Sequence, residues 1–252
     1  NTSIVNEYST SSDNRRATND QQNTLEKYEN IEGMFPIKME SRVDLFPSEN
    51  RYAVESTSIL RNKSKTTLTE LLVTEKEKLS TISIENASLI EHDTEYGVYI
   101  FSFNEPVKPN DEVVFKYTLD KQLKGFETSK HIVNNGSYIM HRDFKPSLVY
   151  RNAMEISNPI EREKRGLPKQ VEEEESDDHM LNTQHYLGRV YYETIISTET
   201  NQIALGSGEL KKEWKENDRN YYHYASDGLI MPVTGYFSAE YSEKVTVHKG
   251  IK

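Results

Sequence analysis

Cysteine is absent from all 252 residues of the chain. Disulfides and thiolate metal ligands are therefore excluded, while the redox compartment stays open. No run approaches the roughly 20 apolar residues that a membrane-spanning helix needs. Cations are in deficit, with 31 Lys and Arg against 41 Asp and Glu and a formal net charge of -10. This balance disfavours binding to nucleic acid or to an anionic membrane surface.

The N-terminus lacks both an initiating Met and the apolar stretch of a signal peptide, because residues 1–20 are almost entirely polar. We therefore expect a fragment or a processed product whose anchor lies elsewhere. Residues 1–30 are interpreted as a polar tether with a short helix near Thr24.

Apolar side chains are also scarce, at 35% of the chain with a mean hydropathy of -0.80. Part of the chain should therefore lie outside any core. Aromatic residues are present as 16 Tyr, 8 Phe and one Trp. Tyr favours half-buried strand faces, because it combines β propensity with a polar hydroxyl.

Alternation with a period of two begins at Ile37, where Met39, Val43 and Leu45 alternate with charged residues. This pattern predicts a strand with one solvent-facing side. Further short β-type runs are separated by turn residues, with little helical periodicity, which indicates an all-β fold of β-sandwich or saddle-like sheets. These runs cover residues 52–60, 67–74, 82–90, 96–103, 113–119, 137–140, 189–198, 201–205, 220–224 and 235–247.

The run pattern divides the chain into a β-sandwich at 31–150, an acidic linker at 151–186 and a second β portion at 187–252 that packs on the first. The linker contains seven consecutive positions, 172–178, that are acidic except for Ser176. Calcium loops alternate their carboxylates and need a turning Gly, so this run is interpreted as a solvated segment. One helical turn is expected around residues 160–165.

Histidine is the usual general base and metal ligand, but none of the seven histidines has the spacing of a zinc helix. His141 and Asp143 are two residues apart and are interpreted as a polar pair in a loop or at a strand edge. His179 and His185 flank the acidic run. Metal binding there is not favoured, because a segment without fixed structure would have to become ordered when it binds the metal. Gly206-Ser207-Gly208 departs from the nucleophile motif G-x-S-x-G and indicates a turn.

Aromatic residues are concentrated in the last third of the chain. Exposed aromatics can stack on sugars or anchor peptides, whereas sheet packing with hydroxyls at the rim is the commoner use. Sheet packing is favoured overall, and an interface role for some members stays open. The candidate contact residues are Trp214, Tyr221, Tyr222, Tyr224, Tyr236, Phe237 and Tyr241.

Several segments, taken together and in order, resemble one family. These are VDLFP at 43–47 with Arg51-Tyr52, FNEPVKPND at 103–111, GF at 125–126, NNGSY at 134–138, PSLVY at 146–150, EREKRGLP at 161–168, NQIALGSGEL at 201–210 with KEW at 212–214, and DRNYYHY at 218–224. The series is similar to the N-terminal β region of bacterial membrane proteins that fuse an ABC-type permease to a zinc-aminopeptidase-like (gluzincin) region.

This resemblance implies a saddle-shaped β-domain beside a peptidase domain, on the extracytoplasmic or periplasmic side of the cytoplasmic membrane. Its partners would be the downstream peptidase-like domain and the membrane helices of the same polypeptide, together with a peptide substrate. Zinc would belong to that downstream domain, so no catalytic, cofactor-binding or metal residue is carried over to this chain. Gly206-Ser207-Gly208 lacks the Pro found in the family's turn.

The sequence therefore predicts a non-catalytic module that positions substrate or the neighbouring peptidase-like domain. One alternative is a free-standing carbohydrate- or peptide-binding module that uses the C-terminal aromatics. Another is a hydrolase in its own right, with His141 and Asp143 or His223 as its working groups.

Overall fold

The computed structural model describes residues 10, 20, 25, 27–123, 131–150, 158–164, 166, 169, 188–244 and 246. Within these residues the chain is mostly β, with three sheets and a few short helices. The all-β fold class expected from the sequence is confirmed. In this part of the chain no helix is long and apolar enough to cross a membrane.

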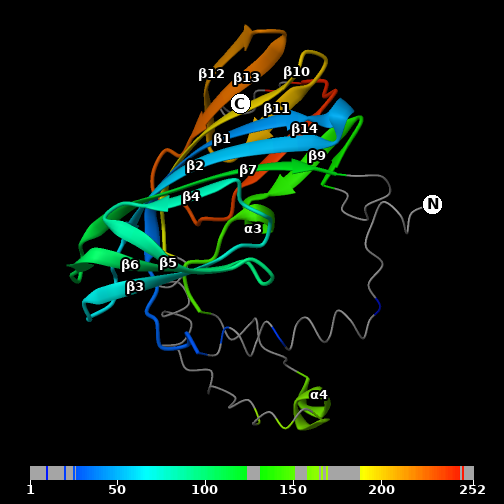
Figure 1. The fold of residues 1–252 in the computed structure, drawn as a ribbon. Helices are drawn as coiled ribbons and strands as arrows, with labels where there is room; N and C mark the ends of the chain where they lie inside the picture. The colour runs from blue at the N-terminus through cyan, green and yellow to red at the C-terminus, as the bar shows by residue number, and fades with distance from the viewer. Residues whose placement is uncertain are drawn as a thin grey trace.

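The largest sheet joins segments from both ends of the chain (Figure 1). Its strand order is β12-β13-β10-β1-β2-β7-β4. Its neighbours pair antiparallel except β1 and β10, which run parallel with Lys38 opposite Tyr191. The strands are β1 (Phe35–Phe46), β2 (Arg51–Arg61), β4 (Thr81–Ile84), β7 (Glu112–Gln122), β10 (Tyr191–Glu199), β12 (Glu209–Glu216) and β13 (Arg219–Ala225).

Two smaller sheets accompany the large one, and buried residues of all three sheets form one main core. The four-stranded sheet has the order β11-β14-β9-β8, with β8 (Ile132–Val133), β9 (Gly136–Met140), β11 (Ile203–Gly206) and β14 (Gly235–Ala239). The three-stranded sheet has the order β3-β6-β5, with β3 (Leu68–Thr74), β5 (Ala87–Asp93) and β6 (Val98–Val107). The helices are η1 (Pro47–Glu49), α3 (His141–Phe144) and α4 (Pro159–Lys164).

The alternation predicted for the first strand is present in β1. Met39, Val43 and Leu45 are buried, while Glu40 and Arg42 are exposed. Successive side chains of a strand point to opposite faces, so this pattern places one face on the core and the other in solvent.

The two predicted β portions contribute strands to the same sheets. β10, β12 and β13 enter the large sheet beside β1, and β11 and β14 enter the four-stranded sheet beside β9. The sequence analysis expected the second portion to pack on the first. Instead, backbone hydrogen bonds join the two portions within common sheets. The boundaries at 30, 150 and 186 stay a prediction.

The helical turn expected in the linker is confirmed by α4. The acidic run at 172–178 lies outside the described residues, as does most of the predicted tether. Two described residues of that tether, Leu25 and Tyr28, are buried against the three-stranded sheet together with Leu72, Val98 and Ile100.

Candidate functional site

His141 and Asp143 do not act on each other. The His141 imidazole is 2% exposed, and its Nε2 lies 3.4 Å from the Tyr117 hydroxyl. The Asp143 carboxylate accepts the Met140 N–H at 2.9 Å and lies 3.6 Å from His131 Nδ1. Asp143 thus caps α3 on the surface side, while His141 is turned into the core, so the pair considered for a hydrolase is not assembled.

The buried environment of His141 changes its titration. Desolvation, with a smaller effect of the positive charge on Lys145, lowers the pKa of His141 from 6.5 to about 3. Its Nδ1 atom has no hydrogen-bond partner among the described residues. The ring also packs edge-on against Phe144, with centroids 5.3 Å apart. His141 is therefore a neutral core residue at physiological pH.

His223 forms the other histidine contact of interest. Its Nε2 lies 2.7 Å from Glu193 Oε1, and the two residues are diagonal neighbours across the β10–β13 pair, where His223 lies opposite Ile195 and Glu193 opposite Ala225. No group of three or more His, Asp or Glu that could hold a metal ion lies among the described residues. His179 and His185 are outside those residues. The residues described thus offer no ligand set that fits zinc.

Ser207 is part of the turn that follows β11. Its Oγ accepts the N–H of Gly235 at 3.2 Å, and the neighbouring Gly208 has a φ of +98°. Positive φ is open to Gly at little cost, and a Cβ at this position would meet Ala225 O at 2.6 Å. These contacts give the Gly-Ser-Gly segment a structural role.

The seven candidate aromatics do not share one surface. Tyr222, Tyr224 and Tyr236 are buried in the main core. Trp214 and Tyr221 lie on the outer face of the large sheet, with rings stacked 5.1 Å apart. Phe237 belongs to the four-stranded sheet, and the exposed Tyr241 follows it. A contact role stays a prediction only for the members that reach the surface.

Charged residues dominate the outer face of the large sheet, and they surround its few aromatics. The Arg42 guanidinium lies 5.9 Å from the Tyr221 ring, and Lys212 Nζ lies 5.1 Å from the Trp214 ring. Tyr221 is consequently buried beneath its neighbours. The stack is therefore covered by cations, which leaves little open aromatic surface for a sugar.

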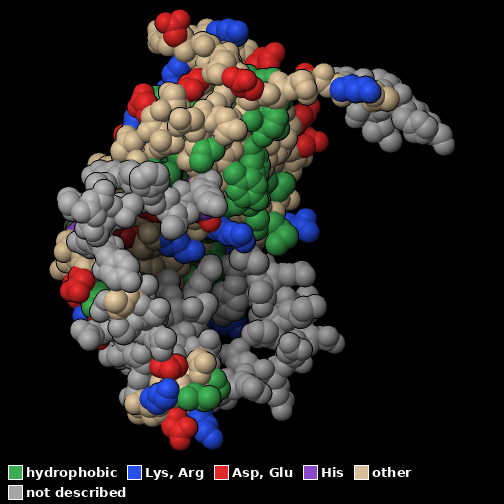
Figure 2. All heavy atoms as spheres, turned by 90° about the vertical axis from the view of Figure 1, so that its right-hand side faces the viewer, with side chains coloured by type: hydrophobic (Ala, Val, Ile, Leu, Met, Phe, Trp, Pro, Cys, Tyr) green, Lys and Arg blue, Asp and Glu red, His purple; other side chains and the backbone are tan. Residues whose placement is uncertain are grey.

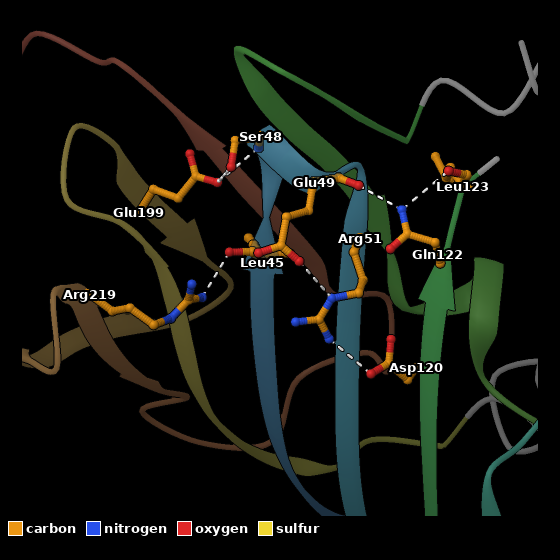
Figure 3. Close-up of polar contacts among 9 residues, drawn as sticks. All are labelled: Leu45, Ser48, Glu49, Arg51, Asp120, Gln122, Leu123, Glu199 and Arg219. Atoms are coloured by element: carbon orange, nitrogen blue, oxygen red, sulfur yellow. Dashed lines mark hydrogen bonds and ion pairs between the residues drawn. The ribbon is translucent and has the colours of Figure 1, made fainter. Parts of the chain in front are cut away.

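A dense polar network secures the end of β1 (Figure 3). Arg219 donates to the Leu45 carbonyl at 2.8 Å, and Arg51 donates to Glu49 and Asp120 at 3.1 and 2.9 Å. Both guanidiniums lie over the Phe46 ring, at 3.8 Å for Arg51 and 4.1 Å for Arg219. These cation–π contacts and hydrogen bonds indicate a structural role, in which the two arginines fix the end of β1 and the turn η1 that follows it.

The four-stranded sheet has an outer face of opposite character. Strand pairing places Leu205, Phe237 and Tyr138 in one row of large aliphatic and aromatic side chains. Tyr138 is 60% exposed, Val133 45% and Leu205 42%. Figure 2 shows hydrophobic side chains gathered in a continuous band on this side of the molecule. We call this the apolar sheet face, made of Val133, Gly136, Tyr138, Met140, Ile203, Leu205, Gly235, Phe237 and Ala239.

Sequence reasoning did not identify this face, although a signal for it exists. The Gly235–Ala239 and Gly136–Met140 strands carry apolar or small side chains at the outward positions. A strand with only one buried face would carry polar residues there. The apolar or small residues at these outward positions are therefore the sequence signal for the apolar sheet face.

No protein-family model matches the sequence, and a search of curated proteins found no match. The structure is similar to solved M1 zinc metallopeptidases of Deinococcus radiodurans. One is an E323A mutant bound to a Tyr-Ser-Ala substrate, with 8% identity and a TM-score of 0.52 over 82% of this chain and 42% of that one. Another structure of that peptidase has 10% identity and a TM-score of 0.50 over the same shares.

The likeness concerns the fold, and the chain spans less than half of those peptidase chains. The gluzincin-like part of the resemblance noted in the sequence agrees with this fold.

Proposed function

We propose that this chain is a non-catalytic β-module of a membrane-anchored, aminopeptidase-like permease protein. In this proposal it lies on the extracytoplasmic side and positions the peptidase-like domain of the same polypeptide. Zinc and the catalytic groups belong to that neighbouring domain. The observation that carries the proposal is the apolar sheet face.

Exposed apolar surface of this kind is unfavourable unless something covers it. Burial stabilises by about 25 cal/mol per Å² of apolar area, and contiguous patches of several hundred Å² mark interaction sites. The apolar sheet face has no charged side chain among its members, whereas β1 alone presents Lys38, Glu40, Arg42 and Asp44 on its outer side. This contrast favours a protein partner on the four-stranded sheet.

The choice of partner rests on the fold comparison and the motif series. The matched peptidases are more than twice as long as the aligned part, so a second region accompanies this fold in them. The ordered motifs resemble proteins in which permease helices and a peptidase-like region accompany this β region. A neighbouring domain of the same polypeptide is therefore the occupant that we infer for the apolar sheet face.

The first test is the complete reading frame that contains this sequence. The proposal expects hydrophobic membrane helices and a gluzincin-like region in the same polypeptide. A frame that encodes neither would overturn it.

The second test introduces Leu205→Ser and Phe237→Ser together and measures their effect both in the whole protein and in the isolated 252-residue chain. In the whole protein we expect a loss of several degrees in Tm, because the substitutions place hydroxyls in a buried interface. In the isolated 252-residue chain the loss should be small, because Leu205 is exposed and Phe237 half-buried. The matched control is Ile90→Ser on β5, where the side chain is 57% exposed. Equal losses in both contexts would contradict docking at this face.

A further inference from the structure

A cleft of about 250 Å³ lies at the end of the apolar sheet face, where four segments meet. These segments are the residues around the start of β1, the loop after β3, the stretch from α3 to Val149, and the residues just before β14. Val233 lines the cleft and is also exposed two residues before β14. Figure 2 shows Lys and Arg side chains gathered at the lower end of the hydrophobic band.

The cleft is cationic in a chain that is acidic overall. Lys76, Arg142 and Lys145 line it, and no acidic residue is among its described lining residues. The formal net charge of the whole chain is -10, so the local charge of the cleft is opposite in sign to that of the chain. A cleft lined by one sign of charge concentrates counter-ions of the other sign.

Two acidic residues next to these cations in sequence, Glu75 and Glu77, have their contacts elsewhere, Glu77 with Lys121 Nζ at 2.9 Å, while Asp143 lies at the limit of ion-pair distance from Arg142. Glu75 accepts the Tyr99 hydroxyl at 2.7 Å and the Leu79 N–H at 3.0 Å. Asp143 caps α3 through the Met140 N–H, and its Oδ1 lies 4.0 Å from Arg142 Nε. The Arg142 side chain is 77% exposed. Its guanidinium therefore keeps donors available to a ligand.

The walls of the cleft are apolar and rigid. Pro36, Pro146 and Pro232 line it, and proline fixes its own φ. The chain beside the cleft is closely packed, because a Cβ on Gly33, next to the lining residue Met34, would approach Cγ1 of the lining residue Val149 to 2.1 Å. Walls that do not reorganise reduce the ordering cost of binding.

We propose that this cleft binds a carboxylate attached to an apolar group, as found in a peptide. The carboxylate pairs with Arg142 and Lys76, and the apolar part lies against the proline-lined wall. Two sources of this chemistry exist, the C-terminal carboxylate of a peptide and an Asp or Glu side chain. This site goes beyond the docking of the neighbouring domain and does not depend on it.

The binding test uses four synthetic probes, titrated into the 252-residue chain and followed by NMR. N-acetyl-Leu-Phe carries a C-terminal carboxylate, and N-acetyl-Leu-Glu-amide carries a side-chain carboxylate. Their neutral counterparts are N-acetyl-Leu-Phe-amide and N-acetyl-Leu-Gln-amide. We expect at least one acid to bind about fivefold or more tightly than its amide, less so at higher salt. The preferred acid identifies the source, and equal affinity of both acids with their amides, or no binding of either acid, overturns the proposal.

Single variants locate the site. Arg142→Gln and Lys76→Gln should each weaken binding of the preferred acid about fivefold, because each removes one ion pair near the surface. Lys116→Gln is the matched control, since Lys116 is an exposed cation on the outer side of β7. Circular dichroism melts check that each variant folds. Unchanged affinity in both cleft variants, or an equal loss in the control, would place binding elsewhere and overturn the proposal.

Discussion

At the scale of single residues, the ionisable groups buried in the core are held in their neutral forms. Tyr236 is fully buried, and its hydroxyl lies 3.2 Å from Ser41 Oγ, while desolvation raises the pKa of Tyr236 well above its usual value. His141 lies in the same core with the Tyr117 hydroxyl against its Nε2. These groups stay neutral because a charge in this position would lose its hydration.

His141 should make the protein sensitive to acid. Its pKa is lowered from 6.5 to about 3 in the folded state, so only the unfolded state takes up a proton between these values. The contribution of His141 to the free energy of unfolding is therefore constant above about pH 6.5. It falls by about 1.4 kcal/mol per pH unit as the pH decreases toward 3, because only the unfolded state gains the proton. Denaturant unfolding of His141→Gln between pH 7 and 4 should show a shallower pH dependence than the parent chain.

The control for this measurement is His92→Gln, because His92 is exposed on β5. Its pH profile should follow that of the parent chain. A profile of His141→Gln that parallels the parent would show that the His141 ring gains a proton in the folded protein. The comparison uses slopes, so a general loss of stability in the variant does not affect it.

At the scale of elements, the turns are set by a few residues with unusual backbone angles. Asn217 and Asp218 have φ values of 48° and 56° and connect β12 to β13, where Glu216 pairs with Arg219. Positive φ at both central positions is the signature of a two-residue type I′ hairpin. Asn and Asp tolerate this region better than branched residues do.

This turn gives a matched pair of substitutions. Asp218→Val should lower the free energy of unfolding by about 1–2 kcal/mol, because a branched side chain is strained at positive φ. Asp218→Gly should leave it unchanged or raise it slightly, because Gly adopts this conformation freely. Chemical denaturation of both variants measures the difference. Equal stability of the Val and Gly variants would contradict a type I′ turn.

One strand of this hairpin was not predicted from the sequence. β12 has the sequence ELKKEWKE, and nearly all of it is exposed. Both faces of an edge strand can contact water, so it lacks the alternation that marks a half-buried strand. A bulge between Leu210 and Lys212 shifts its register further. Its pairing with β13 therefore decides its structure.

At the scale of the whole molecule, the sheets depend on long-range pairing. β1 lies between β2 and β10, and its parallel partner β10 begins more than 140 residues after β1. The four-stranded sheet likewise takes β8 and β9 from the first β portion and β11 and β14 from the second. Among the described residues, the first β portion completes only the three-stranded sheet by itself, and the second portion completes none.

A shortened chain tests this dependence. Residues 1–150 alone would leave β1 with one unpaired edge and remove two strands of the four-stranded sheet. Buried residues such as Ile139 and Phe144 would lose Tyr192 and Tyr236 from the common core. We expect no cooperative thermal transition, whereas the 252-residue chain should unfold in one step. A sharp melt of residues 1–150 with dispersed NMR signals would contradict this expectation.

The sequence by itself determined the fold class, most strand positions and the helical turn at α4. These features follow from local causes, namely side-chain alternation, turn residues and β propensity. Tertiary structure alone decided which strands are neighbours and therefore which faces are covered. It separated the C-terminal aromatics, buried Tyr236, turned His141 away from Asp143 and brought Lys76 near Arg142 in one cleft. The physical reason is that these arrangements depend on contacts between residues far apart in sequence, and local periodicity carries no information about such contacts.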